Sequence, residues 1–155
     1  MSGWEDLARD LAESGMPESL KKNLTDSLWK FSESDLFAQI TKAAELYREE
    51  PFSFIENNVL VRGVIDLFFK SGDDIIIVDF KTGKSIPDSE SEISEEYKLQ
   101  LEIYALALER ALHIVPSKLI LHYLSTDSSV ELPCGQVTLD TVSAALHDAI
   151  DKMSE

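Results

Sequence analysis

Two carboxylates and one lysine interrupt neighbouring apolar segments of this chain. Asp66 lies within the apolar segment 59–69, and Asp79 and Lys81 close the segment 74–81. Two carboxylates in contact repel each other, so one of them holds a proton unless a cation lies between them. Mg²⁺ suits such a pair, because it takes one or two carboxylates together with waters and phosphate oxygens. These residue types predict a Mg²⁺ or Mn²⁺ site suited to the hydrolysis of a phosphodiester.

Both segments are expected to be β-strands that pair as an antiparallel hairpin. They are rich in β-branched and aromatic residues, and Ser71-Gly72-Asp73 between them is typical of a turn. Because side chains alternate across a strand, Asp79 and Lys81 share one face of the second strand. Pairing across the hairpin then brings them to Asp66. The residues expected on the same face as Asp66 are Arg62, Val64 and Phe68.

A helix is expected over 94–112, directly after the polar, acidic segment that follows the second strand. Tyr97, Gln100 and Tyr104 recur at i, i+3 and i+7 and share one stripe of this helix. A glutamine in a largely apolar helix needs polar partners. Gln100 is therefore directed at the metal site or a phosphate, or it is a core glutamine between two packing tyrosines.

A plainer interpretation of the hairpin is also open. An Asp-x-Lys strand end can be a solvated surface ion pair, which contributes about 0–1 kcal/mol. The apolar character of both strands and the polar stripe of the following helix favour a functional site.

Three motifs resemble, in order and spacing, those of the nuclease domain of RecB and AddA helicase–nucleases, in the PD-(D/E)xK phosphodiesterase superfamily. Residues 63–66 match the family's Gly-x-x-Asp element. Residues 79–83 match Asp-Tyr-Lys-Thr-Gly, with Phe80 in the tyrosine position, and residues 100–104 match Gln-x-x-x-Tyr. The resemblance covers residues 45–125.

The resemblance implies an α/β, restriction-endonuclease-like fold, with a mixed central sheet of about five strands flanked by helices and an N-terminal helical segment. It implies a Mg²⁺- or Mn²⁺-dependent deoxyribonuclease of DNA repair. Asp66, Asp79 and the backbone carbonyl of Phe80 would bind the metal, Lys81 would position the nucleophilic water, and Gln100 would orient the substrate or a water. The implied DNA-binding residues are Arg62, Thr82, Gly83, Lys84, Tyr97, Lys98 and Tyr104.

One family feature is missing from the chain. Relatives complete the metal site with a histidine or glutamate on an upstream helix, whereas all three histidines here lie downstream of Glu50. We therefore expect either a fragment of a larger helicase–nuclease or a variant with a reduced site. The second possibility leads to an alternative function, a catalytically incomplete nuclease-fold module for protein–protein interaction in a repair complex. An accidental motif match in an ordinary α/β domain predicts no shared face for the charged residues. Glu45, Glu49 and Glu50 are the possible substitute ligands.

Composition bounds the environment and the partners. The 155 residues are expected to form one domain, and the single cysteine, Cys134, fits a reducing bacterial or archaeal cytosol or nucleoid. No apolar run is long enough to cross a membrane.

The net charge of −15 opposes autonomous DNA binding, because non-specific affinity depends on basic residues. A helicase domain or subunit that delivers a single-stranded DNA end would offset this through a high effective concentration. A local basic rim is expected from Arg62, Lys70, Lys81, Lys84 and Lys98.

The remaining elements complete the expected single domain 1–155. Residues 1–50 are expected to be a helical lead-in, with helices around Trp4–Leu11, from Pro17, and from Asp35 through Tyr47. The segment 51–125 carries the motifs, with a short strand at Phe52–Ile55 and a strand at 118–124 parallel to 74–81. Residues 126–155 are expected to supply a strand at 130–132 and a helix capped by Thr138.

Overall fold

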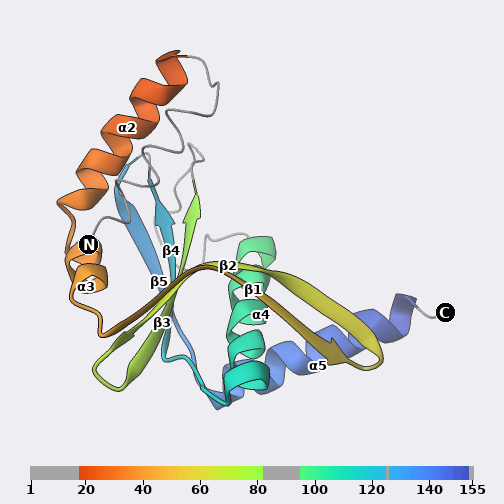
Figure 1. The fold of residues 1–155 in the computed structure, drawn as a ribbon. Helices are drawn as coiled ribbons and strands as arrows, with labels where there is room; N and C mark the ends of the chain where they lie inside the picture. The colour runs from red at the N-terminus through yellow and green to blue at the C-terminus, as the bar shows by residue number, and fades with distance from the viewer. Residues whose placement is uncertain (1–17, 82–94, 125, 154–155) are drawn as a thin grey trace.

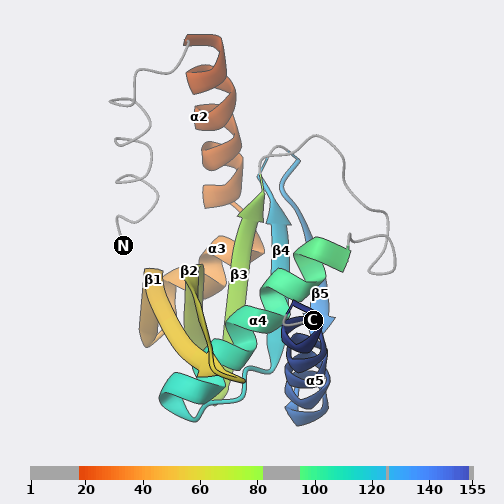
Figure 2. The same ribbon diagram turned by 90° about the vertical axis from the view of Figure 1, so that its right-hand side faces the viewer.

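The computed structural model describes residues 18–81, 95–124 and 126–153, which build a mixed five-stranded sheet with helices on both faces (Figures 1 and 2). The strands lie in chain order across the sheet: β1 (Glu45–Glu56), β2 (Val59–Ser71), β3 (Asp74–Lys81), β4 (Lys118–Tyr123) and β5 (Ser128–Pro133). The helices are α2 (Glu18–Ser32) and α3 (Asp35–Thr41) on one face, and α4 (Glu95–Leu112) and α5 (Gln136–Met153) on the other.

Turn chemistry fixes the two hairpins at the start of the sheet. Asn57 and Asn58, between β1 and β2, have φ of 49° and 65°, which tight hairpin turns require and asparagine tolerates. Gly72 plays this part between β2 and β3, with φ of 63°. The predicted hairpin of 59–69 with 74–81 is confirmed, and so is the parallel pairing of β3 with β4, which α4 connects.

Two apolar layers hold the helices to the sheet. Ile75 and Ile77 of β3 pack beneath α4 and α5, whereas Ile76 and Val78 pack against α2 and α3. Odd and even positions of β3 therefore face opposite layers, as strand geometry requires. This alternation assigns Asp79 to the α4 face of the sheet.

The hairpin of β1 and β2 has an irregular point near Asp66. The β1–β2 register includes the residues on both sides but omits the pair of Glu49 and Asp66, and Glu49 has φ of 49°. Ile65 and Phe68 are three residues apart, yet both pack in the layer beneath α4. The alternation of β2 therefore changes between them, although the register with β1 is the same on both sides.

This change corrects one expectation about β2. Phe68 packs on the α4 side, and Asp66 contacts groups on that side, whereas Arg62 and Val64 are exposed on the opposite face of the hairpin. The prediction that all four side chains share a face is therefore wrong for Arg62 and Val64. Strict alternation failed as a rule because the strand is irregular beside Asp66.

The sheet begins earlier than expected. α3 ends at Thr41, and Tyr47 lies in β1, which begins at Glu45 rather than near Phe52. Pro51 suggested a strand start, but β1 is an edge strand, where a proline is tolerated in mid-strand. The helix expected around Trp4–Leu11 lies outside the described residues.

The last helix also begins earlier than expected. α5 begins at Gln136, and Thr138 lies inside its first turn, where its hydroxyl accepts a hydrogen bond from the Gly135 N–H at 3.2 Å. Thr138 is therefore not the cap. β5 covers the expected strand at 130–132 with additional residues at each end.

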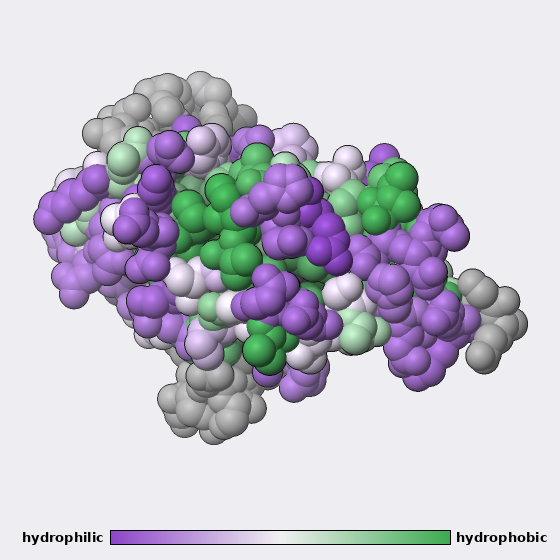
Figure 3. Space-filling view, turned by 90° about the horizontal axis from the view of Figure 1, so that it is seen from below, coloured by the Kyte–Doolittle hydropathy of each residue, from purple (hydrophilic) through white to green (hydrophobic). Residues whose placement is uncertain are grey.

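Polar residues cover most of the face seen from below, and apolar residues form limited groups among them (Figure 3). Ile55 and Leu60, cross-strand neighbours near the tip of the hairpin, are 70% and 57% exposed. Within the described ranges, no helix combines the length and apolar character needed to cross a membrane.

Candidate active site

Asp66, Asp79 and Lys81 come together at the carboxyl end of β3, on the face covered by α4. Lys81 Nζ lies 2.9 Å from Asp79 Oδ2. The β2–β3 register runs up to the pair of Leu67 and Val78, and beyond it Asp66 Oδ2 accepts a hydrogen bond from the Phe80 N–H at 3.0 Å. The irregularity of β2 thus places a carboxylate where a backbone ladder bond would otherwise form.

The ionised form of Asp79 is disfavoured in the folded protein. Asp79 is 2% exposed. Burial raises the pKa of Asp79 to about 6, with a further upward contribution from the neighbouring Asp66 and a downward one from Lys81. Its Oδ2 atom is buried and close to Lys81 but has no aligned hydrogen bond. A carboxylate in this state favours either a proton or an additional cation.

Residues of α4 orient the lysine. Gln100 Oε1 accepts a hydrogen bond from Lys81 Nζ at 3.1 Å, and Gln100 Nε2 donates to the Tyr104 hydroxyl at 2.9 Å. The ammonium also lies 4.3 Å from the centre of the Tyr97 ring, a cation–π distance. The structure therefore brings together the predicted stripe of Tyr97, Gln100 and Tyr104 with Lys81.

Tyr104 is a neutral member of this group. Burial raises the pKa of Tyr104 to about 12, and the charges of Asp79 and Asp66 act in the same direction, against a downward contribution from Gln100. Tyr104 is buried, so its hydroxyl serves the internal network rather than a ligand in solution. It remains a phenol throughout the neutral pH range.

The donor set fits a hard divalent cation. Asp66 and Asp79 present two carboxylates in mutual contact, and one of their buried oxygens lacks an aligned hydrogen bond. Across the described ranges, no group of three or more His, Cys, Asp or Glu side chains is placed to hold a metal. Mg²⁺ accepts such a sparse protein contribution, because waters and substrate phosphates complete its shell.

The back of β3 is fixed by aromatic packing on the other face of the sheet. The Phe80 ring contacts Phe31 of α2 edge-on at 5.4 Å between centroids and lies 6.0 Å from His122. His122 is buried, with Nδ1 2.6 Å from Ser129 Oγ. Phenylalanine in the family's tyrosine position thus serves this packing.

The other predicted DNA-contacting residues fall into three groups. Lys98 is half-buried on α4 and lowers the pKa of Glu102, which burial raises. Arg62 is exposed beside Ser53 on the outer face of the hairpin, away from Lys81. The remaining three, Thr82, Gly83 and Lys84, lie outside the described residues.

A polar cluster at the hairpin tip was not expected from the sequence. Glu56, 6% exposed, accepts hydrogen bonds from Arg110 at 3.3 Å to each carboxylate oxygen and from Ser143 at 3.0 Å, and it lies 2.6 Å from His147 Nε2. Burial acts to raise the pKa of Glu56, but these partners outweigh it and lower the pKa. The cluster ties β1 to α4 and α5.

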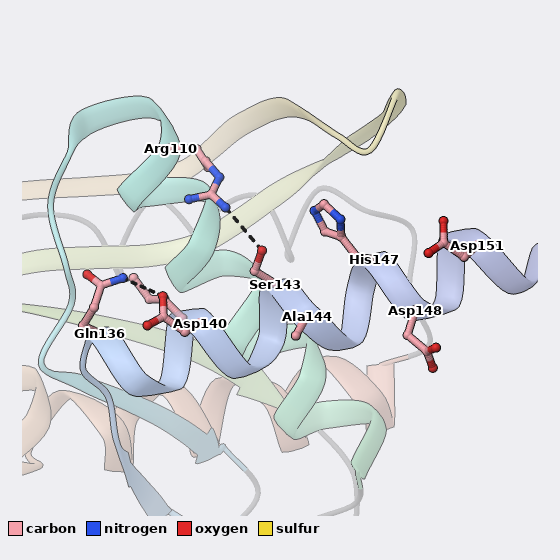
Figure 4. A pocket seen from close by; sticks show the side chains of 9 residues that line it. Arg110, Gln136, Asp140, Ser143, Ala144, His147, Asp148 and Asp151 are labelled. Atoms are coloured by element: carbon pink, nitrogen blue, oxygen red, sulfur yellow. Dashed lines mark hydrogen bonds between the residues drawn. The ribbon is translucent and has the colours of Figure 1, made fainter.

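Figure 4 shows how the partners of Glu56 lie around an open pocket on α5. Arg110 reaches from α4 toward Ser143, and His147 lies one turn further along α5. No sequence signal marks this cluster, because its members are separated by tens of residues and belong to no motif. It lies apart from the Asp79 site and is a structural link between elements.

Comparisons with known proteins agree on one family. A family model described as the PD-(D/E)XK nuclease superfamily matches residues 3–154. The A subunit of the ATP-dependent helicase/nuclease of Syntrophomonas wolfei is 33% identical over 96 residues, which are 54% of this chain and 8% of that protein. The protein of the same name from Streptococcus mutans is 32% identical over 128 residues, 76% of this chain and 10% of that protein. This chain thus spans about one tenth of the length of these relatives.

A solved structure supports the fold. A candidate exonuclease from Eubacterium rectale superposes with a TM-score of 0.65 at 12% identity, covering 97% of this chain and 62% of that chain. At this identity the likeness concerns the fold alone. With the five-stranded mixed sheet, it confirms the predicted restriction-endonuclease-like architecture.

Proposed function

Since this chain belongs to the PD-(D/E)XK nuclease superfamily, we propose that it is the nuclease domain of a helicase–nuclease and hydrolyses DNA phosphodiesters with Mg²⁺ or Mn²⁺. One observation carries the proposal. An ammonium group, Lys81, is held by Asp79, Gln100 and Tyr97 beside a pair of adjoining carboxylates. A surface ion pair would have no need of so many fixed partners.

The two carboxylates and one carbonyl would hold the metal. Asp66 and Asp79 supply charged oxygens, and the backbone carbonyl of Phe80 lies between Asp79 and Lys81 in the chain. A bound ion supplies electrostatic stabilisation of the charge that develops on the phosphate. Burial, and after it the neighbouring Asp66, raise the pKa of Asp79, and a bound cation would offset both penalties.

Lys81 acts on the attacking water, and Gln100 holds Lys81 in place. Lys81 Nζ, fixed at 2.9 Å from Asp79, positions the water for attack and adds positive charge beside the phosphate. Gln100 holds the ammonium in that direction through its carbonyl oxygen. In the hydrolysis, the attacking water gives one proton to solvent as its oxygen forms a bond to phosphorus, the ester P–O bond breaks, and the leaving oxygen takes a proton from a solvent water.

The DNA strand would approach over the amino-terminal end of α4. Tyr97 and Lys98 are partly exposed there and offer an aromatic face and a charge to a nucleotide. Tyr104 is buried and supports Gln100 instead. Thr82, Gly83 and Lys84 follow Lys81 directly in the chain and would contact phosphates. Arg62 lies further away on the hairpin, outside this path.

DNA would be delivered by a partner motor. The net charge of −15 makes free association with DNA weak, since basic residues supply non-specific affinity. The similar proteins are named helicase/nuclease subunits, so a helicase domain or partner protein in a bacterial-type cytosol is the proposed source of single-stranded ends. Tethering would raise the effective DNA concentration to roughly the millimolar range.

A non-catalytic module for protein–protein interaction is the second candidate. It is favoured by the absence of a third carboxylate or histidine beside Asp66 and Asp79 in the described part of the chain, together with the acidic composition. This second candidate predicts that substitution of Lys81 changes no rate of DNA cleavage.

Cleavage of a labelled single-stranded oligonucleotide in Mn²⁺ tests the proposal through Lys81→Met. The variant should lose about 100-fold or more in rate, as expected for removing a preorganised charge, while still binding Mn²⁺. Lys70 pairs with Ile75 at the opposite end of the hairpin from Lys81, so it does not join the basic rim expected at the site. Lys70→Met is therefore the control and should cleave like the wild type. Equal cleavage by wild type and Lys81→Met would refute the role of Lys81, and absence of cleavage by the wild type would favour the interaction module.

A further inference from the structure

Gly63 makes room for an aromatic ring. Gly63 of β2 pairs with Phe52 of β1, and a Cβ at position 63 would lie 2.9 Å from Phe52 Cζ and 3.0 Å from Cε1. Even alanine would therefore force the ring to shift. The phenyl ring lies across the glycine because that position has no side chain.

The seated ring contacts the helix of the site. Phe52 meets Tyr104 of α4 edge-on, with ring centroids 5.7 Å apart and an interplanar angle of 70°. Edge-to-face contacts of this kind are directional, so the position of one ring restricts the other. Phe54, two residues along on the same side, stacks on Phe52 at 6.2 Å.

A chain of contacts leads from that ring to the lysine. The Tyr104 hydroxyl accepts from Gln100 Nε2 at 2.9 Å, and Gln100 Oε1 accepts from Lys81 Nζ at 3.1 Å. The carboxamide of Gln100 is planar, so a shift of the Tyr104 hydroxyl turns both ends of the group together. Lys81 then loses the direction of its acceptor.

We infer that Phe52, seated over Gly63, is a positioning residue that sets the orientation of Lys81 through Tyr104 and Gln100. The inference rests on the proposed nuclease function, because orientation of Lys81 matters only where it acts on a substrate. It also gives a physical reason for the glycine at position 63, which the backbone does not explain, since no positive φ occurs there.

Ordinary packing makes a different prediction. Phe54 is buried, whereas Phe52 is only partly buried, so a general packing role would make Phe54 the more important ring. The property that distinguishes Phe52 is its contact with Tyr104. A positioning role therefore predicts a loss of turnover from changes at Phe52 that changes at Phe54 do not reproduce.

The test compares Gly63→Ala, Phe52→Leu and the double variant, with Phe54→Leu and Gly135→Ala as matched controls. A Cβ added at Gly135 would meet open space, with no heavy atom within 4 Å. The measurements are kcat and KM for Mn²⁺-dependent cleavage of a labelled single-stranded oligonucleotide, and the NMR resonances of the Gln100 side-chain amide in the metal-free protein.

Gly63→Ala and Phe52→Leu should each lower kcat about 10- to 100-fold, the scale of a small misplacement of a reacting group, with KM within about twofold. The double variant should be no worse than the poorer single variant, because both changes break the same contact. The Gln100 amide resonances should move in these variants and stay in place in both controls. Phe52→Leu alone carries the test if Gly63→Ala does not fold.

Wild-type kcat in Phe52→Leu, an equal loss of kcat in Phe54→Leu, or multiplicative losses in the double variant would each overturn the inference. If the wild type does not cleave DNA, the proposed function fails and the NMR readout decides. Movement of the Gln100 amide resonances in Phe52→Leu but not in Phe54→Leu would then support the contact chain, and no movement would refute it.

Discussion

Neutralising Asp79 should stabilise the metal-free protein. Asp79 is 2% exposed and lies against Asp66, so its ionised form is disfavoured in the folded state. Burial is the larger cause of this penalty and Asp66 the next. Asparagine has nearly the same shape and no charge, so Asp79→Asn removes the penalty while keeping the packing.

The size of the effect follows from the pKa. A rise from about 4 in the unfolded chain to about 6 in the folded one corresponds to about 3 kcal/mol, at 1.36 kcal/mol per pKa unit. Because the folded-state pKa is raised, the stabilising contribution of protonated Asp79 is fully present below about pH 4 and is lost as the pH rises through 6. The wild type should therefore lose about 2 to 3 kcal/mol relative to Asp79→Asn between pH 4 and pH 8.

Urea unfolding in EDTA at a series of pH values measures this difference directly. Asp73→Asn is the control, because Asp73 is exposed in the β2–β3 turn and its substitution should change stability by no more than about 0.5 kcal/mol. A pH-independent difference between wild type and Asp79→Asn, or a less stable Asp79→Asn at pH 8, would refute the electrostatic account of the site.

Of four further predictions, one concerns the metal, two concern the Glu56 cluster and one concerns Tyr97. Mn²⁺ affinity should rise about tenfold per pH unit below pH 6 and level off above it, because the proton on Asp79 competes with the metal. Calorimetric titration at several pH values measures this dependence, and an affinity that does not change with pH would show that Asp79 is not a ligand. Glu56→Gln should lower the free energy of unfolding by about 1–3 kcal/mol, because it weakens the interactions of a buried carboxylate with Arg110. Glu131 is exposed, so the control Glu131→Gln should change the free energy of unfolding little. Equal effects of the two substitutions would contradict the stabilising role of the cluster. Because the pKa of Glu56 is lowered, its contribution to stability is present at neutral pH and is lost as the pH falls through the folded-state pKa. Acid unfolding of the wild type and of Glu56→Gln would measure this loss. Tyr97→Leu should lower kcat while leaving Mn²⁺ affinity unchanged, because it removes the ring beside Lys81 and no metal ligand, and a loss of Mn²⁺ binding would contradict this assignment.

Much of the fold could be predicted from local pattern and turn chemistry. The hairpin of β2 and β3, the long helix α4 and the parallel strand β4 follow from strand composition, a glycine turn and helical periodicity. The boundary between helix and sheet could not, because Tyr47 fits a helical stripe with Leu36 and Ile40 as well as it fits a strand. An edge strand that tolerates Pro51 also hides its own beginning.

The contacts of the candidate site could be predicted only in part. Alternation within β3 predicts that Asp79 and Lys81 share a face, and the i, i+3, i+7 stripe groups Gln100 with the two tyrosines of α4. The hydrogen bond from Lys81 to Gln100 depends in addition on how α4 packs on the sheet. The irregular point at Glu49 and Asp66 is a property of two paired strands, so strict alternation misplaced Arg62. Phe52 was expected in a strand, but its contact with Tyr104 requires the packing of α4 on the sheet.

The central claim is that Asp66 and Asp79 form a metal site that serves DNA hydrolysis. Calorimetric titration of Mn²⁺ into wild type, Asp79→Ala and the control Asp73→Ala, with oligonucleotide cleavage measured on the same samples, tests it most directly. The account predicts that wild type and Asp73→Ala bind Mn²⁺ and cleave DNA, and that Asp79→Ala does neither. Wild-type protein that binds no Mn²⁺ at millimolar concentration, or Asp79→Ala that cleaves like the wild type, would contradict it.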